Sequence, residues 1–207
     1  MAKKQGVVCG VGIVDIDYSI SKKALVNGKK KYVSLCPYYD RWKDMISRCY
    51  NKKVQSKFPT YANVKVCSEW LYFSKFKAWM EQQDWQGKRL DKDILSGFGF
   101  DSVYSPESCA FVTQKTNCFI FSTFGKGKAV GYHEIKNGSG FQSKCADPFK
   151  LRSCYLGTFK TKEDAISAYS KRKMMYAKEL ALIETDKRII DALNKISEGS
   201  CAAYIGN

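Results

Sequence analysis

The sequence predicts an α+β fold, in which helical and strand segments are segregated along the chain. Apolar residues recur at helical spacing within residues 37–50 and again within residues 161–183. Between these segments, residues 131–159 contain three short strand candidates, and Asn137-Gly138 is a strong hairpin signal between the first two. With 207 residues and a hydrophobic content of 44%, the chain can form one compact domain or two small ones.

The first 33 residues predict an extended, lysine-rich arm. Within it, residues 7–17 are expected to form a strand or one arm of a hairpin. The stretch CGVGI has two glycines but lacks the third glycine and the following helix of a nucleotide-binding loop. It therefore predicts a turn or a bulge.

Two helices are predicted next, separated by a polar loop over residues 51–64. The first covers residues 37–50, and five residues form its apolar face: Tyr38, Trp42, Met45, Ile46 and Cys49. The second covers residues 68–80, with Ser68 as its N-cap. Four aromatic residues lie three apart on it: Trp70, Phe73, Phe76 and Trp79. Such a stripe could stack on nucleic-acid bases, but helical spacing favours a core face.

RLDKDIL, residues 89–95, predicts a strand after a glycine-containing turn. Alternation along a strand places Asp91 and Asp93 on one face, which makes them candidate ligands for a divalent metal. YSPESCAFVTQKTN then predicts a turn at Ser105-Pro106, a short strand over residues 109–112 and a helical turn over residues 113–117. TFGKGK, residues 123–128, predicts a flexible linker.

The last third of the chain predicts three strands and two helices. Asp147-Pro148 marks a turn before the third strand. Thr161 and Asp164 form a variant capping box before the long helix. Alternation predicts one strand face toward this helix, made of Phe141, Ser143, Cys145, Cys154 and Leu156, and one face away from it, made of Gln142, Lys144, Ser153 and Tyr155. Residues 186–198 predict a short amphipathic helix that docks on the body or on a partner.

The charge of the chain favours a polyanionic partner. The formal net charge is +15 at pH 7 and the pI is about 9.4, which points to nucleic acid or an anionic surface.

No run approaches the ~18 apolar residues of a membrane span, so no membrane association is expected. Nine cysteines without a C-x-x-C pair and a single histidine predict buried thiols in the cytoplasm, and neither a disulfide framework nor a zinc site.

The strings GYHEI, GFQSKCADP and YLGTFKTKEDAISAY, within residues 131–169, resemble the DNA-binding domain of the plant APETALA and ethylene-response-factor type, which also occurs in phages and mobile elements. The resemblance implies a domain over residues 129–183 whose three-stranded sheet lies in the major groove of duplex DNA, with the helix packed behind it. The family's DNA-facing positions fall on His133, Lys144, Ser153 and Tyr155. Ser153 and Ala146 stand where the family has arginines.

Two further kinds of DNA contact are predicted from side-chain chemistry. An amide such as that of Gln142 is suited to reading base edges. Three basic residues are expected to contact phosphates and position the sheet: Lys136, Lys150 and Arg152.

A second resemblance covers residues 38–120 and implies a domain over residues 34–122. W-x-x-M-x-x-R-C-Y (residues 42–50), V-C-x-E-W (residues 66–70), LDKDIL and YSPESCAFV resemble phage proteins related to HNH homing endonucleases, which use a ββα-metal site. By this resemblance the aspartate–histidine pair of the first strand falls on Asp91 and Lys92, and the middle asparagine falls near Ser108. The last position is kept as Asn117. Lysine is a poor general base unless its pKa is strongly lowered, so a degenerate HNH scaffold without catalytic residues or cofactor is expected.

Three functions are compatible with these patterns. The first is a DNA-binding protein of phage or mobile-element origin, in the host cytoplasm if phage-encoded, which reads duplex DNA with the sheet. The second is an active endonuclease in which Asp91, Lys92, Asp93 and Asn117 are catalytic, and Asp91, Asp93 and Asn117 bind Mg²⁺ or another divalent metal. The third is a phage protein that binds and inhibits a host protein through the C-terminal helix and tail, residues 184–207, or through exposed aromatic side chains.

Overall fold

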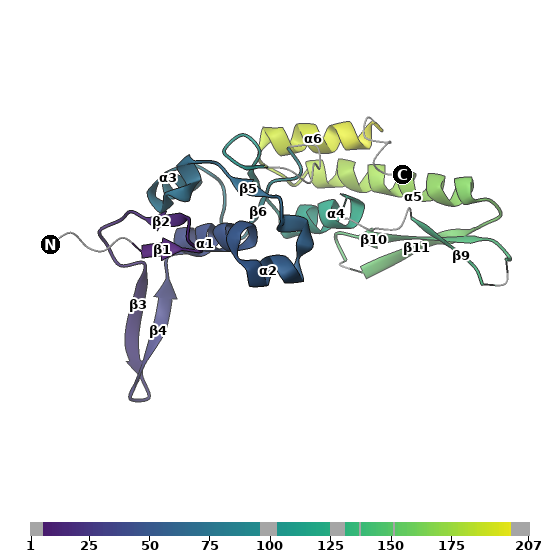
Figure 1. Ribbon diagram of the computed structural model, residues 1–207. Coiled ribbons are helices and arrows are strands. Elements are labelled where there is room, and N and C mark those ends of the chain that lie inside the picture. The colour runs from purple at the N-terminus through teal and green to yellow at the C-terminus, as the bar shows by residue number, and fades with distance from the viewer. Residues whose placement is uncertain (1–5, 96–102, 125–130, 137, 151, 200–207) are drawn as a thin grey trace. The chain divides into compact units, whose positions relative to one another are not determined.

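The computed structural model describes residues 6–95, 103–124, 131–136, 138–150 and 152–199 and confirms the α+β class (Figure 1). The chain forms two compact units. Of the described residues, 6–83 and 103–109 belong to the first unit, and 84–95 and 110–199 belong to the second. This division differs from the expected domain boundaries, because residues 84–95 and 110–122 join the second unit and not the HNH-like half.

The first unit begins with two hairpins in place of the predicted extended arm. Strands β1 (Gly6–Val8) and β2 (Gly12–Val14) are antiparallel. Cys9 and Gly10 turn between them with φ of 52° and 79°, which confirms the predicted turn in CGVGI. Strands β3 (Ser21–Val26) and β4 (Lys29–Leu35) form the second hairpin. The extended-arm prediction is wrong because Asn27-Gly28 is itself a hairpin signal, and both residues have the positive φ that a tight turn requires.

Helix α1 (Pro37–Tyr50) has the predicted bounds, and four of the five residues of its predicted apolar face are buried, whereas Tyr38 is half-buried. Trp42, the largest residue of that face, donates a hydrogen bond of 2.7 Å from its Nε1 to the carbonyl of Trp70. The prediction of a polar loop over residues 51–64 is wrong. Helix α2 (Lys52–Lys57) and a 3₁₀ turn, η1 (Pro59–Tyr61), occupy it, and the side chain of Asn51 caps α2 by accepting from the N–H groups of Lys53 and Val54.

The single helix predicted over residues 68–80 is interrupted. A 3₁₀ turn, η2 (Glu69–Leu71), precedes α3 (Phe73–Met80), and Tyr72 between them has extended backbone angles. Ser68 makes no capping hydrogen bond. The N–H of Ser74 instead donates to Asp15, 59 residues earlier, at 2.8 Å.

The aromatic stripe over η2 and α3 packs in the core of this unit, as helical spacing predicted. Trp70, Phe73 and Phe76 are buried, and Trp79 packs against Trp70 with ring centroids 4.5 Å apart and the ring planes tilted by 49°. Strands β5 (Lys65–Val66) and β7 (Val103–Tyr104) form a short parallel pair that completes the unit.

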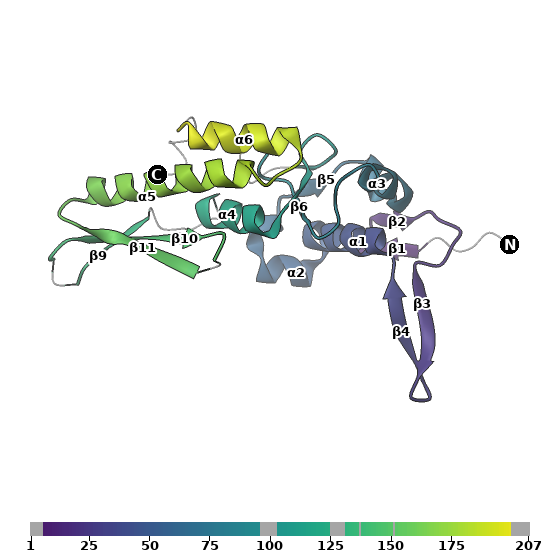
Figure 2. The same cartoon turned by 180° about the vertical axis from the view of Figure 1, so that it is seen from behind.

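The second unit is built on a three-stranded antiparallel sheet in the order β11-β10-β9. Its strands are β9 (Tyr132–Glu134), β10 (Phe141–Asp147) and β11 (Arg152–Phe159). Helix α5 (Lys162–Ala181) covers one face of the sheet, and α6 (Lys187–Ser197) lies on the far side of α5, as two opposite views show (Figure 1, Figure 2). The hydroxyl of Thr161 accepts from the N–H of Asp164 at 3.1 Å, which confirms the predicted helix start.

A second antiparallel pair, β6 (Arg89–Asp91) and β8 (Ala110–Val112), leads into helix α4 (Gln114–Phe124). The helical turn predicted over residues 113–117 is thus a longer helix. The predicted linker over residues 123–128 begins inside that helix, and its residues 125–128 lie outside the described part of the chain.

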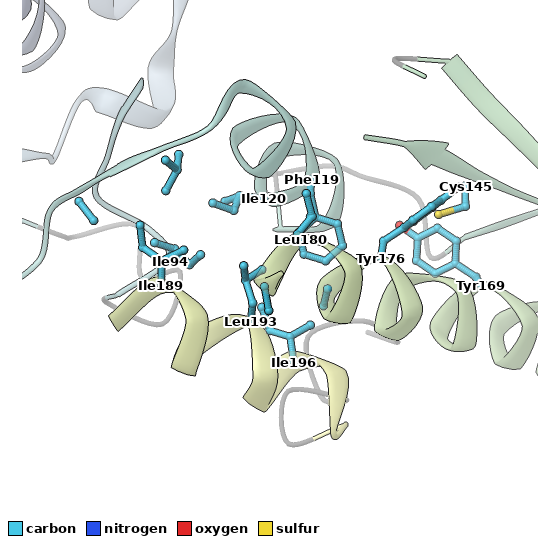
Figure 3. Close-up of a cluster of buried hydrophobic side chains, with 14 residues drawn as sticks. Ile94, Phe119, Ile120, Cys145, Tyr169, Tyr176, Leu180, Ile189, Leu193 and Ile196 are labelled. Atoms are coloured by element: carbon cyan, nitrogen blue, oxygen red, sulfur yellow. The ribbon is translucent and has the colours of Figure 1, made fainter. Parts of the chain in front are cut away.

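One hydrophobic core joins these elements (Figure 3). Helix α4 contributes Phe119 and Ile120, and β6 leads to Ile94. Helix α6 contributes Ile189, Leu193 and Ile196, which confirms that the C-terminal amphipathic helix docks on the body. The sheet therefore shares its core with α4 and α6 within the second unit.

Candidate nucleic-acid interface

The sheet of the second unit has one closed face and one open face. Along β10, Ser143, Cys145 and Asp147 are buried, whereas Lys144 and Ala146 are exposed. Because side chains alternate along a strand, the buried residues face α5 and the exposed ones face away from it. The strand faces predicted from the sequence are confirmed here.

The pairing of the strands brings the open-face residues side by side. Gln142 of β10 lies between His133 of β9 and Thr158 of β11. One step along the strand, Lys144 lies opposite Tyr155. Directly opposed residues on one face have Cβ atoms about 5 Å apart. Four of the predicted DNA-facing residues are therefore contiguous on this face: His133, Gln142, Lys144 and Tyr155.

A β-bulge in β11 sets which residues reach this face. The register shifts between Ser143 and Lys144, so that Leu156 has no partner in β10. The extra residue keeps Thr158 as well as Tyr155 on the open side, and Gly157, with φ of 139°, adopts a backbone conformation that other residues rarely tolerate. The Tyr155 and Thr158 hydroxyl groups share a hydrogen bond of 2.8 Å. Tyr155 remains 55% exposed, so its ring is available for contact.

Basic residues lie at both ends of this face. Lys136 is exposed in the connection between β9 and β10, and Lys150 is exposed in the connection between β10 and β11. Arg152 is exposed at the start of β11 but pairs with Asp147, which lies on the closed side. Arg152 therefore lies at the edge of the sheet and not on its open face, a position compatible with the predicted phosphate contact.

Asp147 organises the turn that carries Lys150. Its Oδ1 accepts from the N–H groups of Phe149 and Lys150, at 2.9 and 3.1 Å, as predicted for a turn at Asp147-Pro148. Burial alone would raise the pKa of Asp147, but these N–H groups, the Tyr176 hydroxyl and the charge of Lys150 lower it overall. The carboxylate is thus held in its charged form and the turn is fixed.

Lys173 of α5, fully buried in the layer that supports the sheet, was not predicted. Its Nζ donates to the Ser122 hydroxyl at 2.8 Å and lies 5.0 Å from the ring centre of Phe119 and 5.5 Å from that of Tyr169. A buried ammonium group needs such partners, because leaving water is costly for a charge. The sequence does indicate that Lys173 is buried, because Lys173 lies four residues after Tyr169 and therefore on the apolar face of the helix.

The RLDKDIL segment, predicted as one strand, ends its strand at Asp91. The buried carboxylate of Asp91 accepts from the N–H groups of Asp93 and Ile94, at 3.0 and 2.9 Å. The chain therefore turns after Asp91, and the prediction that Asp91 and Asp93 share one strand face is wrong. Burial, and next the charge of Asp93, raise the pKa of Asp91 to about 6.

The other residues of the alternative nuclease site have separate environments. Lys92 is buried and forms an ion pair with Asp93. Asn117 lies half-buried in the first turns of α4, where its N–H donates to the Thr113 carbonyl at 2.9 Å. Ser108 belongs to the first unit, and its hydroxyl donates to the Val103 carbonyl. Among the described residues, no three histidine, cysteine or acidic side chains cluster as they would to hold a metal ion.

Comparison with protein-family models, with curated proteins and with solved structures finds no match to this chain. The two resemblances stay predictions that rest on the motifs quoted above. Within the described residues, no helix has both the length and the apolarity needed to span a bilayer.

Proposed function

We propose that this chain is a DNA-binding protein, of phage or mobile-element origin, that places the open face of β9–β11 in the major groove of duplex DNA. In this proposal His133, Gln142, Lys144 and Tyr155 contact base edges, and Lys136, Lys150 and Arg152 contact phosphates. The HNH-like segments hold the DNA backbone and lack a complete catalytic site.

The observation that carries this proposal is the two-sided character of the sheet. One face is buried under α5, and the other presents an imidazole, an amide, an ammonium group and a phenol in adjacent cross-strand positions. An amide and a lysine are side chains that pair with base edges, and an exposed aromatic ring can contact bases or the thymine methyl group. If this face were only a solvated surface, any polar residues would suit it, and this particular set of side chains would not be needed.

The charge around the face supports the same partner. Lys144 lies on the face, and Lys136, Lys150 and Arg152 lie at its ends. Glu134 is the acidic residue of β9, but it pairs with Phe141 and is thus directed to the other side of the sheet. Positive side chains at both ends of a polar face can contact phosphates on either side of a groove.

The two alternative functions gain no comparable support. A nuclease would need the Asp91 carboxylate for a metal, but that carboxylate accepts two backbone hydrogen bonds within its own turn. A host-protein inhibitor acting through the C-terminal helix would need an exposed apolar face, but Ile189, Leu193 and Ile196 are buried in the core of the second unit. The nuclease, and an inhibitor that acts through this helix, would therefore each require local rearrangement.

The test is binding to a labelled duplex at increasing salt, followed by fluorescence anisotropy. The three phosphate contacts of the sheet, by Lys136, Lys150 and Arg152, contribute about −2.7 to the log–log slope, and Lys150→Gln makes the slope shallower by about 0.9. Tyr155→Ala weakens binding without changing the slope. Lys178→Gln is the matched control, because Lys178 is exposed on α5. A slope near zero for the unaltered protein, or equal effects of Lys150→Gln and Lys178→Gln, would refute the proposal.

A further inference from the structure

The hairpin formed by β3 and β4 is a separate basic surface in the first unit. The two strands pair with each other over their whole length, from Ser21 opposite Leu35 to Val26 opposite Lys29. Their paired ribbon extends from the body of this unit (Figure 1). The side chains of Lys22, Lys29 and Lys31 are exposed. Neither β3 nor β4 packs on another element of the described chain as closely as the two strands pack on each other. The packing of this unit therefore does not require so many cations on the ribbon.

The pairing places these three lysines on one face of the ribbon. Ala24 lies opposite Lys31, so these two residues share a face. Lys22 is two residues before Ala24 in β3, and Lys29 is two residues before Lys31 in β4, so alternation puts both on that same face. The register shift between Lys22 and Lys23 is absorbed in β4 and leaves the alternation of β3 intact. Both strands therefore contribute cations to a single lysine face, defined here as Lys22, Lys29 and Lys31.

The ribbon has no compensating negative charge. Residues 18–39 contain five lysines and no aspartate or glutamate. Neighbouring like charges repel one another, so such a face is costly for the isolated hairpin and favourable once a polyanion binds. Lysines two residues apart along a strand are separated by about 7 Å, and the strands themselves by about 5 Å.

We infer that the β3–β4 ribbon is a second duplex-DNA contact, which enters the major groove and places its lysine face against the phosphates. The major groove of B-form DNA, about 12 Å wide and 8.5 Å deep, admits a two-stranded ribbon. The seven residues of β4 extend for about 23 Å, which is enough to cross the groove. The inference shares the partner of the proposed function but depends on different residues, in the other unit.

The same geometry distinguishes duplex DNA from two other polyanions. The major groove of A-form RNA is deep and narrow, so a duplex RNA of equal length should compete poorly. An anionic membrane could attract the lysines and take up Leu25, which is 70% exposed near the turn. Among the ribbon side chains that the structure describes, Leu25 and Leu35 are the large apolar ones that are exposed. DNA is the partner that matches cations carried on both strands.

The test compares two triple variants of the full chain that lose equal charge. The ribbon variant is Lys22→Gln, Lys29→Gln and Lys31→Gln. The control is Lys171→Gln, Lys178→Gln and Lys195→Gln, at exposed positions of α5 and α6. Duplex binding is measured by anisotropy from 50 to 300 mM salt, and far-UV circular dichroism checks that both variants are folded. A parallel acetylation footprint reports whether bound DNA protects each lysine.

The ribbon variant should make the salt slope shallower by about 2.7 and lower the affinity at 0.1 M salt by up to about 500-fold, since each lost contact is worth about 8-fold there. Lys22, Lys29 and Lys31 should be protected from acetylation by duplex DNA, and the control lysines should not. The inference is overturned if both variants behave alike, if the ribbon lysines stay reactive, if duplex RNA competes as well as DNA, or if the ribbon variant loses binding only to anionic vesicles.

A third variant separates this inference from the proposed function. Lys144→Gln combined with Tyr155→Ala alters the sheet and leaves the ribbon intact. Loss of binding in the sheet variant alone refutes the ribbon contact. Loss in the ribbon variant alone refutes the role of the sheet and leaves the ribbon contact standing. Loss in both, each with its own change in slope or affinity, supports two contacts.

Discussion

Replacement of Gly131 by alanine should destabilise the second unit, because this glycine lies where β9 meets α5. A Cβ added at Gly131 would lie 2.0 Å from Cγ and 2.5 Å from Cβ of Tyr169. These atoms are close to the helix backbone, so a rotation of the tyrosine ring cannot relieve the overlap. Gly131 also has φ of 79°, and its carbonyl accepts a hydrogen bond from Ser143 at 2.7 Å.

The expected cost has two parts. A left-handed conformation costs a non-glycine residue about 1–2 kcal/mol. Overpacking a filled site costs a further ~1–3 kcal/mol. Gly131→Ala should therefore lower the free energy of unfolding by about 2–5 kcal/mol.

Gly138→Ala is the matched control for this prediction. Gly138 has a similar φ of 71°, but beyond its two chain neighbours no described atom lies within 4 Å of the position of its added Cβ. This variant should show the conformational part alone, about 1–2 kcal/mol. Urea unfolding monitored by tryptophan fluorescence and circular dichroism measures both values, and a double variant with Tyr169→Ala measures the coupling. Equal costs for Gly131→Ala and Gly138→Ala, with no coupling to Tyr169, would refute the close approach of β9 to α5.

Three further predictions concern hydrogen bonds that hold local structure. The raised pKa of Asp91 means that the folded state binds the proton of this carboxyl group more tightly than the unfolded state does, so stability should fall as pH rises from about 4 to about 6. Asp91→Asn should remove this pH dependence and raise the free energy of unfolding at pH 7 by up to ~3 kcal/mol. Urea titrations at several pH values measure both effects. Thr161→Ala removes the α5 cap and should cost about 1 kcal/mol, whereas Ser167→Ala on the exposed side of the same helix should cost little. Asp15→Ala removes the acceptor at the start of α3 and should cost about 0.5–2 kcal/mol, and Asp15→Asn should restore part of it, both read from urea midpoints.

The parts of the fold that local patterns encode could be predicted from the sequence. Helical spacing identified α1 and α5, and alternation identified which side chains of β10 face the helix. The β3–β4 hairpin was predictable by the same rule that predicts a hairpin from Asn137-Gly138, because Asn27-Gly28 is an equal signal. Lysine-rich flanks obscured it, since strands of low hydrophobicity resemble an extended arm.

The parts that depend on distant partners could not be predicted. The cap of α3 comes from Asp15, 59 residues away, so the nearby Ser68 was a reasonable but wrong choice. The turn after Asp91 depends on burial of its carboxylate, which allows two backbone N–H groups to replace water as partners. A pattern of alternating residues cannot show whether a carboxylate will face solvent or its own backbone. The metal-site interpretation of RLDKDIL rested on this alternation and therefore missed the turn after Asp91.

The bulge in β11 shows how one inserted residue changes the proposed interface. Strict alternation from Tyr155 would put Gly157 on the open face and Thr158 on the closed face. Because Leu156 is the extra residue, Thr158 instead lies beside Gln142, and His133, Gln142 and Thr158 form a row across all three strands. On the open face, the shift thus replaces Gly157, which has no side chain, by Thr158, whose hydroxyl group shares a hydrogen bond with that of Tyr155. Thr158→Ala should therefore weaken duplex binding through Tyr155, and the loss should be smaller when Tyr155 is already alanine.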